Sequence, residues 1–120
     1  MILVDTSVWI DHLRTGDERL SDLLNHGQVV IHPFVIGELA CGNLRKRDEV
    51  LRLLNNLPQA TVASQDEVLH LIGRKKLMGL GIGFIDAHLL ASAALTDTAA
   101  IWTRDKRLQK TARKLNRAFD

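Results

Sequence analysis

The chain opens with four apolar residues that end abruptly at an acid. Met1 to Val4 form a short apolar run, in which two of the four residues are Ile or Val, and Asp5 closes it. An apolar run of this length is typical of a strand that is buried on both faces, as in a parallel sheet covered by helices. The first five residues therefore predict a strand of a parallel sheet with an acid at its carboxyl end.

Strand and helix patterns alternate along the rest of the chain. Further short apolar runs predict strands at 29–31, 60–63 and 100–103, with a small edge strand at 117–119. Helical spacing and start signals predict helices over 6–13, from Asp17 to 24, from Pro33, over 45–54, from Ser64 through Leu77, over 84–95, and in the basic closing segment. This alternation implies one three-layer α/β/α domain over 1–120, with a mainly parallel sheet of four or five strands. A ligand site is expected beyond the carboxyl ends of the strands.

Composition limits the class of protein further. With 120 residues, 46% of them hydrophobic and 25% charged, the chain matches a single globular domain. Its one cysteine, Cys41, excludes an intrachain disulfide and favours a reducing compartment. No basic leader precedes the first apolar residues, and no apolar run approaches the length of about 18 residues that a membrane span needs. We therefore expect a cytoplasmic protein without a membrane segment.

The basic residues are unevenly distributed. The formal net charge is only +2, yet seven Lys and Arg residues lie between Arg104 and Arg117 with a single acid, Asp105, among them. Smaller basic groups occur at 45–47 and 74–76. Such clusters are typical of surfaces that bind polyanions, but also of ordinary solvated helix faces. The charge permits a nucleic-acid partner without requiring one.

Four carboxylates stand where the fold pattern alone does not explain them. Asp5 and Asp105 each follow a strand and precede a helix, which is also where an Asp can serve as a helix cap. Glu38 and Asp86 interrupt the apolar helical segments PFVIGELACG and GFIDAHLLASAAL. Because a buried charge needs a partner or a metal, we expect a cationic group at Glu38 unless that side chain points to water.

A parallel sheet can bring these four acids to one end. Clustered carboxylates repel each other in a low dielectric, so either their pKa values rise or a hard cation neutralises them. Sets of oxygen ligands select Mg²⁺ or Mn²⁺ rather than Zn²⁺. An acidic metal site on a basic chain suits the hydrolysis of a phosphate backbone. A loop is expected at 96–98, which makes Asp97 a poor candidate ligand.

Four segments together resemble the PIN-domain ribonucleases, and in particular the VapC-type toxins of toxin–antitoxin pairs: ILVDTSVWI, VIGELA, GIGFIDAHLLASA and WTRD. The resemblance covers essentially the whole chain. It implies a parallel α/β/α fold and an endoribonuclease that depends on Mg²⁺ or Mn²⁺. It further implies a homodimer that a small VapB-type antitoxin inhibits.

The resemblance carries roles onto individual residues. The acidic quartet of catalytic residues and metal ligands corresponds to Asp5, Glu38, Asp86 and Asp105. Ser7 and Thr103 match supporting hydroxyl positions. We also expect the neighbouring cations Arg104 and Lys106 to hold the RNA backbone without reading its sequence.

Other functions fit the residues less well. A phosphatase of the haloacid dehalogenase type would need a second Asp two positions after Asp5, where this chain has Ser7. A response-regulator receiver would need an acidic pair near the first strand, and Asp5 has no adjacent acid. The alternative that remains open is a non-catalytic PIN-like domain that binds RNA or an antitoxin without turnover.

Overall fold

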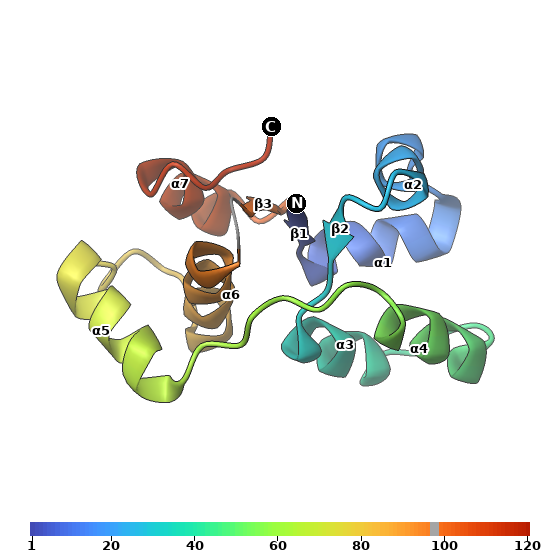
Figure 1. Ribbon diagram of the computed structural model, residues 1–120, viewed down its shortest axis with the longest axis horizontal. Coiled ribbons are helices and arrows are strands. Elements are labelled where there is room, and N and C mark those ends of the chain that lie inside the picture. Colours follow the sequence, from blue (N-terminus) through green and yellow to red (C-terminus); the bar gives the residue numbers. More distant parts are fainter. Residues whose placement is uncertain (97–98) are drawn as a thin grey trace.

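Three parallel strands lie at the centre of the fold (Figure 1). The computed structural model describes residues 1–96 and 99–120, and its strands are β1 (Ile2–Val4), β2 (Val29–Val30) and β3 (Ala100–Trp102). The central strand β1 pairs in parallel with β2 on one side and with β3 on the other. Asp97 and Thr98, in the loop predicted at 96–98, lie outside the described residues.

The prediction of a parallel α/β fold is confirmed, but the predicted number of strands is wrong. The described residues form a three-stranded sheet, not one of four or five strands, and isolated parallel bridges join Ile31 to Gln59 and Ile101 to Ala118. The expected edge strand at 117–119 is therefore reduced to one bridge.

The segment 60–63 leaves the sheet because the segment that would pair with it turns into a helix at Pro33. Ala60 N–H still donates to the carbonyl of Ile31 at 2.9 Å, as in a strand. The following N–H, of Thr61, donates to the hydroxyl of Thr96 at 2.9 Å. This N–H points away from Ile31, because alternate residues of an extended chain face opposite sides. Parallel pairing beyond Ala60 would need the N–H of residue 33, which is Pro33 and has none, so a regular strand does not form.

Helices lie on both sides of the strands in Figure 1, with α1 to α4 on the right and α5 to α7 on the left. Their bounds are α1 Thr6–Thr15, α2 Glu18–Asn25, α3 Pro33–Ala40, α4 Arg47–Asn55, α5 Gln65–Lys75, α6 Phe84–Leu95 and α7 Lys106–Lys114. Asp17 caps α2 by accepting the N–H of Leu20, and Ser64 forms the predicted capping box with Glu67. The apolar helix α6 spans the predicted range and is buried along its middle turns.

One apolar core fixes the elements that carry the acids. Leu3 of β1, Ile101 of β3, Leu89 of α6 and Leu108 of α7 are almost completely buried in a single cluster. Fully burying a leucine contributes about 1.5–3 kcal/mol, so this cluster holds the ends of β1 and β3 in place. None of the helices within 1–96 and 99–120 is long and apolar enough to cross a membrane.

Candidate active site

The carboxyl ends of β1 and β3 lie next to each other, because Val4 pairs with Trp102 in the parallel register. From these ends the chain passes through Asp5 into α1 and through Asp105 into α7. The two helices lie on opposite sides of the strands in Figure 1. In an open α/β sheet, ligands usually bind beyond the carboxyl ends of two adjacent parallel strands from which the chain continues to opposite sides of the sheet.

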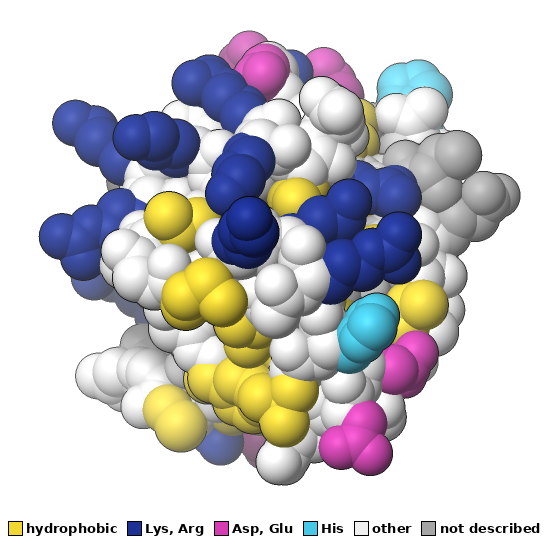
Figure 2. Space-filling view, turned by 90° about the vertical axis from the view of Figure 1, so that its left-hand side faces the viewer, with side chains coloured by type: hydrophobic (Ala, Val, Ile, Leu, Met, Phe, Trp, Pro, Cys, Tyr) yellow, Lys and Arg dark blue, Asp and Glu magenta, His cyan; other side chains and the backbone are white. Residues whose placement is uncertain are grey.

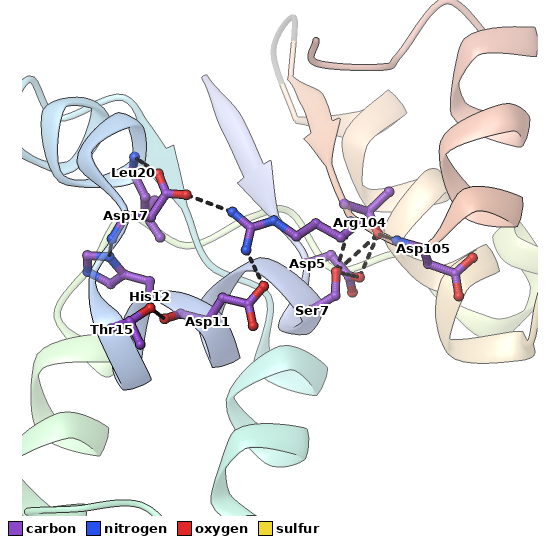
Figure 3. A network of polar contacts seen from close by, with 10 residues as sticks. Asp5, Ser7, Asp11, His12, Thr15, Asp17, Leu20, Arg104 and Asp105 are labelled. Carbon is purple, nitrogen blue, oxygen red and sulfur yellow. Dashed lines mark hydrogen bonds and ion pairs between the residues drawn. The ribbon is translucent and has the colours of Figure 1, made fainter.

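Two hydroxyl groups hold the carboxylate of Asp5, which is only 8% exposed. Its Oδ2 accepts hydrogen bonds from Ser7 Oγ and Thr103 Oγ1, each at 2.8 Å (Figure 3). Each hydroxyl in turn accepts a backbone N–H at 3.0 Å, Ser7 from Arg104 and Thr103 from Asp105. Because hydrogen bonds to a charged group are the stronger kind, this network fixes Asp5 relative to both strand ends.

Asp5 is not a side-chain cap of α1. It occupies the N-cap position, but its carboxylate accepts no N–H from the first turn of the helix. Within the described chain, no hydrogen bond reaches its second oxygen, Oδ1. The helix-cap alternative is therefore wrong for Asp5, and Oδ1 remains for a ligand.

Asp105 does act as a cap, as its position next to a helix suggests. Its Oδ1 accepts the N–H groups of Arg107 at 2.9 Å and Leu108 at 3.0 Å. The side chain is exposed at the start of α7. Capping uses one oxygen of the carboxylate and leaves the other to face a ligand.

At Glu38 the structure meets the alternative expectation, a side chain that points to water. This side chain is exposed on α3, and Thr6 Oγ1 donates a hydrogen bond to its Oε1 at 2.7 Å. A solvated carboxylate needs no counter-charge, so a hydroxyl is sufficient. Thr6 directly follows Asp5 and thus connects the first two acids of the quartet. Sequence reasoning missed Thr6, although its hydroxyl beside Asp5 in the segment DTS was a usable signal.

Asp86 lies half-buried in the first turn of α6, where the N–H of Gly83 donates to its Oδ2 at 3.3 Å. Burial raises the pKa of Asp86 above its ordinary value, and the hydrogen bond from Gly83 opposes this. The negative charges of Asp5, Asp105 and Glu38 raise the pKa further. These three charges act on Asp86 only because they are near it, so the four acids share one negative region.

Arg104 is engaged with other carboxylates beside this region. Its guanidinium pairs with Asp11 and, at 2.6 Å, with Asp17 (Figure 3). The bond to Asp11, followed by that to Asp17, raises the pKa of Arg104 against the effect of burial. Lys106 is exposed and has no ion pair among the described residues. Nothing in the sequence pattern singled out Asp11 as a partner of Arg104.

Comparison with known proteins identifies the family. The sequence model described as PIN domain matches residues 2–114 of this chain. The chain belongs to the PIN-domain family. Ribonuclease VapC32 of Mycobacterium tuberculosis, found in strains CDC 1551 and H37Rv, is 57% identical to this PIN domain over 109 residues. The match covers 91% of this chain and 88% of the relative, and it confirms the predicted resemblance to VapC-type proteins.

Solved structures share the fold of this PIN domain at lower sequence identity. FitAcB from Neisseria gonorrhoeae superimposes with a TM-score of 0.65 and 21% identity, covering 94% of each chain. FitAB bound to the IR36 DNA fragment gives a TM-score of 0.63 and 19% identity, covering 98% of this chain and 92% of that one. Both similarities concern the arrangement of the backbone.

The acids of this PIN domain fit a hard divalent cation in their chemistry. Carboxylate oxygens are the ligands that Mg²⁺ and Mn²⁺ prefer. Asp5 keeps Oδ1 without an internal hydrogen bond among the described residues, and burial, followed by the charges of its acidic neighbours, raises the pKa of Asp86. In the described ranges, no three His, Cys, Asp or Glu side chains are grouped closely enough to hold a metal ion as they stand. The acids thus share a neighbourhood without forming a closed set of ligands.

Proposed function

We propose that this PIN domain is the toxin of a VapBC-type pair and an endoribonuclease that hydrolyses phosphodiester bonds in RNA. The observation that carries the proposal is the fixed carboxylate of Asp5, anchored by Ser7 and Thr103 where β1 and β3 end. The three acids that act on Asp86 extend this negative region. The 57% identity to a protein named ribonuclease VapC32 supports the class of reaction.

Mg²⁺ or Mn²⁺ is the proposed cofactor, and the residues that would hold it are Asp5, Glu38, Asp86 and Asp105. When bound, such a cation supplies Lewis acidity that activates a water and offsets negative charge on a phosphate. Asp86 is suited to this role, because a nearby cation favours the carboxylate form that burial and its neighbours disfavour.

The hydroxyl side chains serve as positioning residues. Ser7 and Thr103 both donate to one oxygen of Asp5, so the other oxygen keeps a constant direction. Thr6, next to Asp5 in the chain, donates one hydrogen bond to Oε1 of Glu38 and so orients that carboxylate. A site built from orientated carboxylates needs little rearrangement when the substrate binds, which is how preorganised groups lower a barrier.

RNA is the proposed substrate, and α7 supplies cations for its backbone. Lys106, Arg107, Lys110 and Lys114 are exposed and have no ion pair within the described chain. Since Asp105 is the N-cap of α7, the basic side of this helix starts directly after one of the acids. Figure 2 views the side of the molecule on which α5 and α7 lie, and Lys and Arg side chains cover much of its upper half. Arg104 can bind the RNA backbone only if the RNA displaces Asp11 and Asp17 from its guanidinium group.

Protein partners complete the proposal. Phe34 and Phe84 are 37% and 47% exposed, and both rings contact His88 edge-on, at centroid distances of 4.8 and 4.7 Å. Exposed aromatic groups of this kind suit a protein interface. We propose that the domain forms a homodimer, binds a VapB-type antitoxin and acts in the cytoplasm.

The decisive experiment is cleavage of labelled RNAs by the purified chain without antitoxin, in Mg²⁺, in Mn²⁺ and in EDTA. Wild-type protein should cleave only with metal, whereas folded Asp5→Asn and Asp86→Asn proteins should not cleave. Asp22→Asn is the matched control, because Asp22 is an exposed acid on α2 away from the strand ends. A folded wild-type chain that cleaves no RNA with either metal would favour the non-catalytic binding domain instead.

A further inference from the structure

The side chain of Arg104 joins the turn after β3 to the first two helices of the chain. Its guanidinium group forms one ion pair with Asp11 of α1 and another, at 2.6 Å, with Asp17 at the N-cap of α2 (Figure 3). These contacts join residues that lie 93 and 87 positions apart in the chain. Arg104 therefore ties the end of β3 to α1 and α2.

The backbone of the same residue leads to Asp5. The N–H of Arg104 donates to Ser7 Oγ at 3.0 Å, and Ser7 Oγ donates to Asp5 Oδ2 at 2.8 Å. The N–H of the next residue, Asp105, donates to Thr103 Oγ1, which donates to the same oxygen of Asp5. The turn between β3 and α7 thus carries one acid of the quartet and orients another, and the side chain of Arg104 anchors this turn.

The local charge disfavours an RNA phosphate at the guanidinium group of Arg104. One positive and two negative side chains give this cluster a net negative charge. Lys106 and Arg107, in contrast, are exposed and have no ion pair within the described residues. A phosphate that approaches the turn is therefore attracted to the first residues of α7 and repelled by the cluster at Arg104.

We propose that Arg104 is a positioning residue, and that its pairs with Asp11 and Asp17 persist while RNA is bound. Through these pairs it holds the turn after β3, and with it Asp5 and Asp105, in the arrangement that cleavage requires. Arginine suits this role because its planar fork can bind two carboxylates at once, which the compact ammonium group of lysine cannot match. The inference rests on the proposed RNA cleavage and adds a residue to its site.

Substitutions at both ends of the ion pairs test the proposal. Arg104→Gln removes the charge, and Arg104→Lys keeps the charge without the fork. Asp11→Asn and Asp17→Asn each remove one partner, and asparagine can still cap α2 through its side-chain oxygen. The matched control is Arg113→Gln, because Arg113 forms an exposed ion pair with Asp120 in the last turn of α7. Exposed ion pairs contribute little to stability, so these variants should fold, which circular dichroism checks.

The variants are compared in kcat, in KM and in the salt dependence of RNA binding in EDTA. Because misplacing a reacting group by about 1 Å can lower a rate about a hundredfold, Arg104→Gln should lower kcat at least about tenfold. KM and the salt dependence should stay unchanged, and Arg104→Lys should not restore kcat. Asp11→Asn and Asp17→Asn should also lower kcat, and adding Arg104→Gln to the double variant should cause no further loss, because all three act through one guanidinium group.

Amide hydrogen exchange provides a readout that does not depend on cleavage. The N–H groups of Arg104 and Asp105 donate to Ser7 and Thr103, so they report on the turn directly. Loosening the turn in Asp11→Asn should accelerate the exchange of both amides at least about tenfold. Asp22→Asn, an exposed acid of α2 without an ion pair among the described residues, should leave the exchange unchanged.

A raised KM in Arg104→Gln, with a salt slope smaller by about 0.7 and normal activity in Arg104→Lys, would indicate a phosphate contact and overturn the proposal. Tighter RNA binding in Asp11→Asn that disappears when Arg104→Gln is added would overturn it as well, because the carboxylate would then compete with RNA. Unchanged kcat or unchanged amide exchange in the folded Asp11→Asn protein has the same meaning. If wild-type protein cleaves no RNA, the proposed nuclease fails, whereas faster exchange in Asp11→Asn alone still supports the anchoring of the turn by Arg104.

Discussion

Replacing Thr103 by valine tests whether Asp5 is held by the hydroxyl network. Thr103 is 4% exposed, and valine has nearly the same shape but no hydroxyl. The change removes a donor to Asp5 Oδ2 at 2.8 Å and an acceptor for the N–H of Asp105 at 3.0 Å. A hydrogen bond to a charged group contributes about 1.5–3 kcal/mol and a neutral one about 0.5–1.5 kcal/mol. Thr103→Val should therefore lower the free energy of unfolding by about 2–4 kcal/mol.

Urea and thermal unfolding measure this loss directly. At about 2.1 cal/mol/K per residue, a chain of 120 residues gains about 0.25 kcal/mol/K of entropy on unfolding, so the expected loss lowers the melting temperature by about 8–16 °C. Thr111→Val is the matched control, because Thr111 is 3% exposed and donates only to the carbonyl of Arg107 in its own helix. It should cost at most about 1.5 kcal/mol.

The effect of Thr103→Val on activity should follow from its effect on Asp5. We expect a lower kcat with little change in KM, because the carboxylate loses one of its two anchors while the RNA surface is untouched. Thr103→Ser retains the hydroxyl and should restore most of kcat. Equal stability losses in Thr103→Val and Thr111→Val, or full activity in a folded Thr103→Val protein, would refute the reasoning.

Three further predictions concern charge. Asp86→Asn should raise the free energy of unfolding of the metal-free protein at pH 7, because burial, followed by its acidic neighbours, raises the pKa of Asp86. In urea titrations this gain should shrink as the pH falls, because wild-type Asp86 then takes up its proton. A destabilised Asp86→Asn protein would contradict the prediction. Mn²⁺ should raise the melting temperature of wild-type protein, by an amount equivalent to about 2.7 kcal/mol at a hundred times Kd, but not that of Asp5→Asn; equal shifts would place the ion elsewhere. Burial, followed by the charge of His88, lowers the pKa of His32 to about 4. As the pH falls below about 6.5, the unfolded chain therefore binds a proton at His32 that the folded chain does not. The free energy of unfolding should fall by about 1.4 kcal/mol per pH unit from about pH 6.5 towards pH 4. His32→Asn keeps an acceptor for the N–H of Phe34 and should show a smaller slope than wild type in the same titration.

The features that sequence predicted correctly depend on near neighbours in the chain. The bounds of α6 follow from an apolar stretch without a polar face. The cap at Asp17 follows from a hydrogen bond to Leu20, three positions later in the chain. The capping box at Ser64 has the same range. The adjacent carboxyl ends of β1 and β3, which carry Asp5 and Asp105, were also predictable, because parallel neighbouring strands bring these ends together.

The features that sequence did not predict join residues far apart. The expected strand at 60–63 is lost because the segment after Ile31, which would pair with it, turns into a helix at Pro33 and has no N–H there to donate. The bond from Thr6 to Glu38 was not predicted and spans 32 positions. The partners of hydroxyl groups depend on packing, so the local sequence shows the Thr6 hydroxyl beside Asp5 but not its distant partner Glu38.

The hydrogen bond from Thr103 to Asp5 spans 98 positions, and it has a consequence for synthesis. A ribosome makes Asp5 well before β3 exists to pair with β1. The growing chain therefore carries its first acid without the hydroxyl that orients it or the acids that accompany it. A nascent copy of the proposed nuclease therefore cannot complete its site before β3 has been made and has paired with β1.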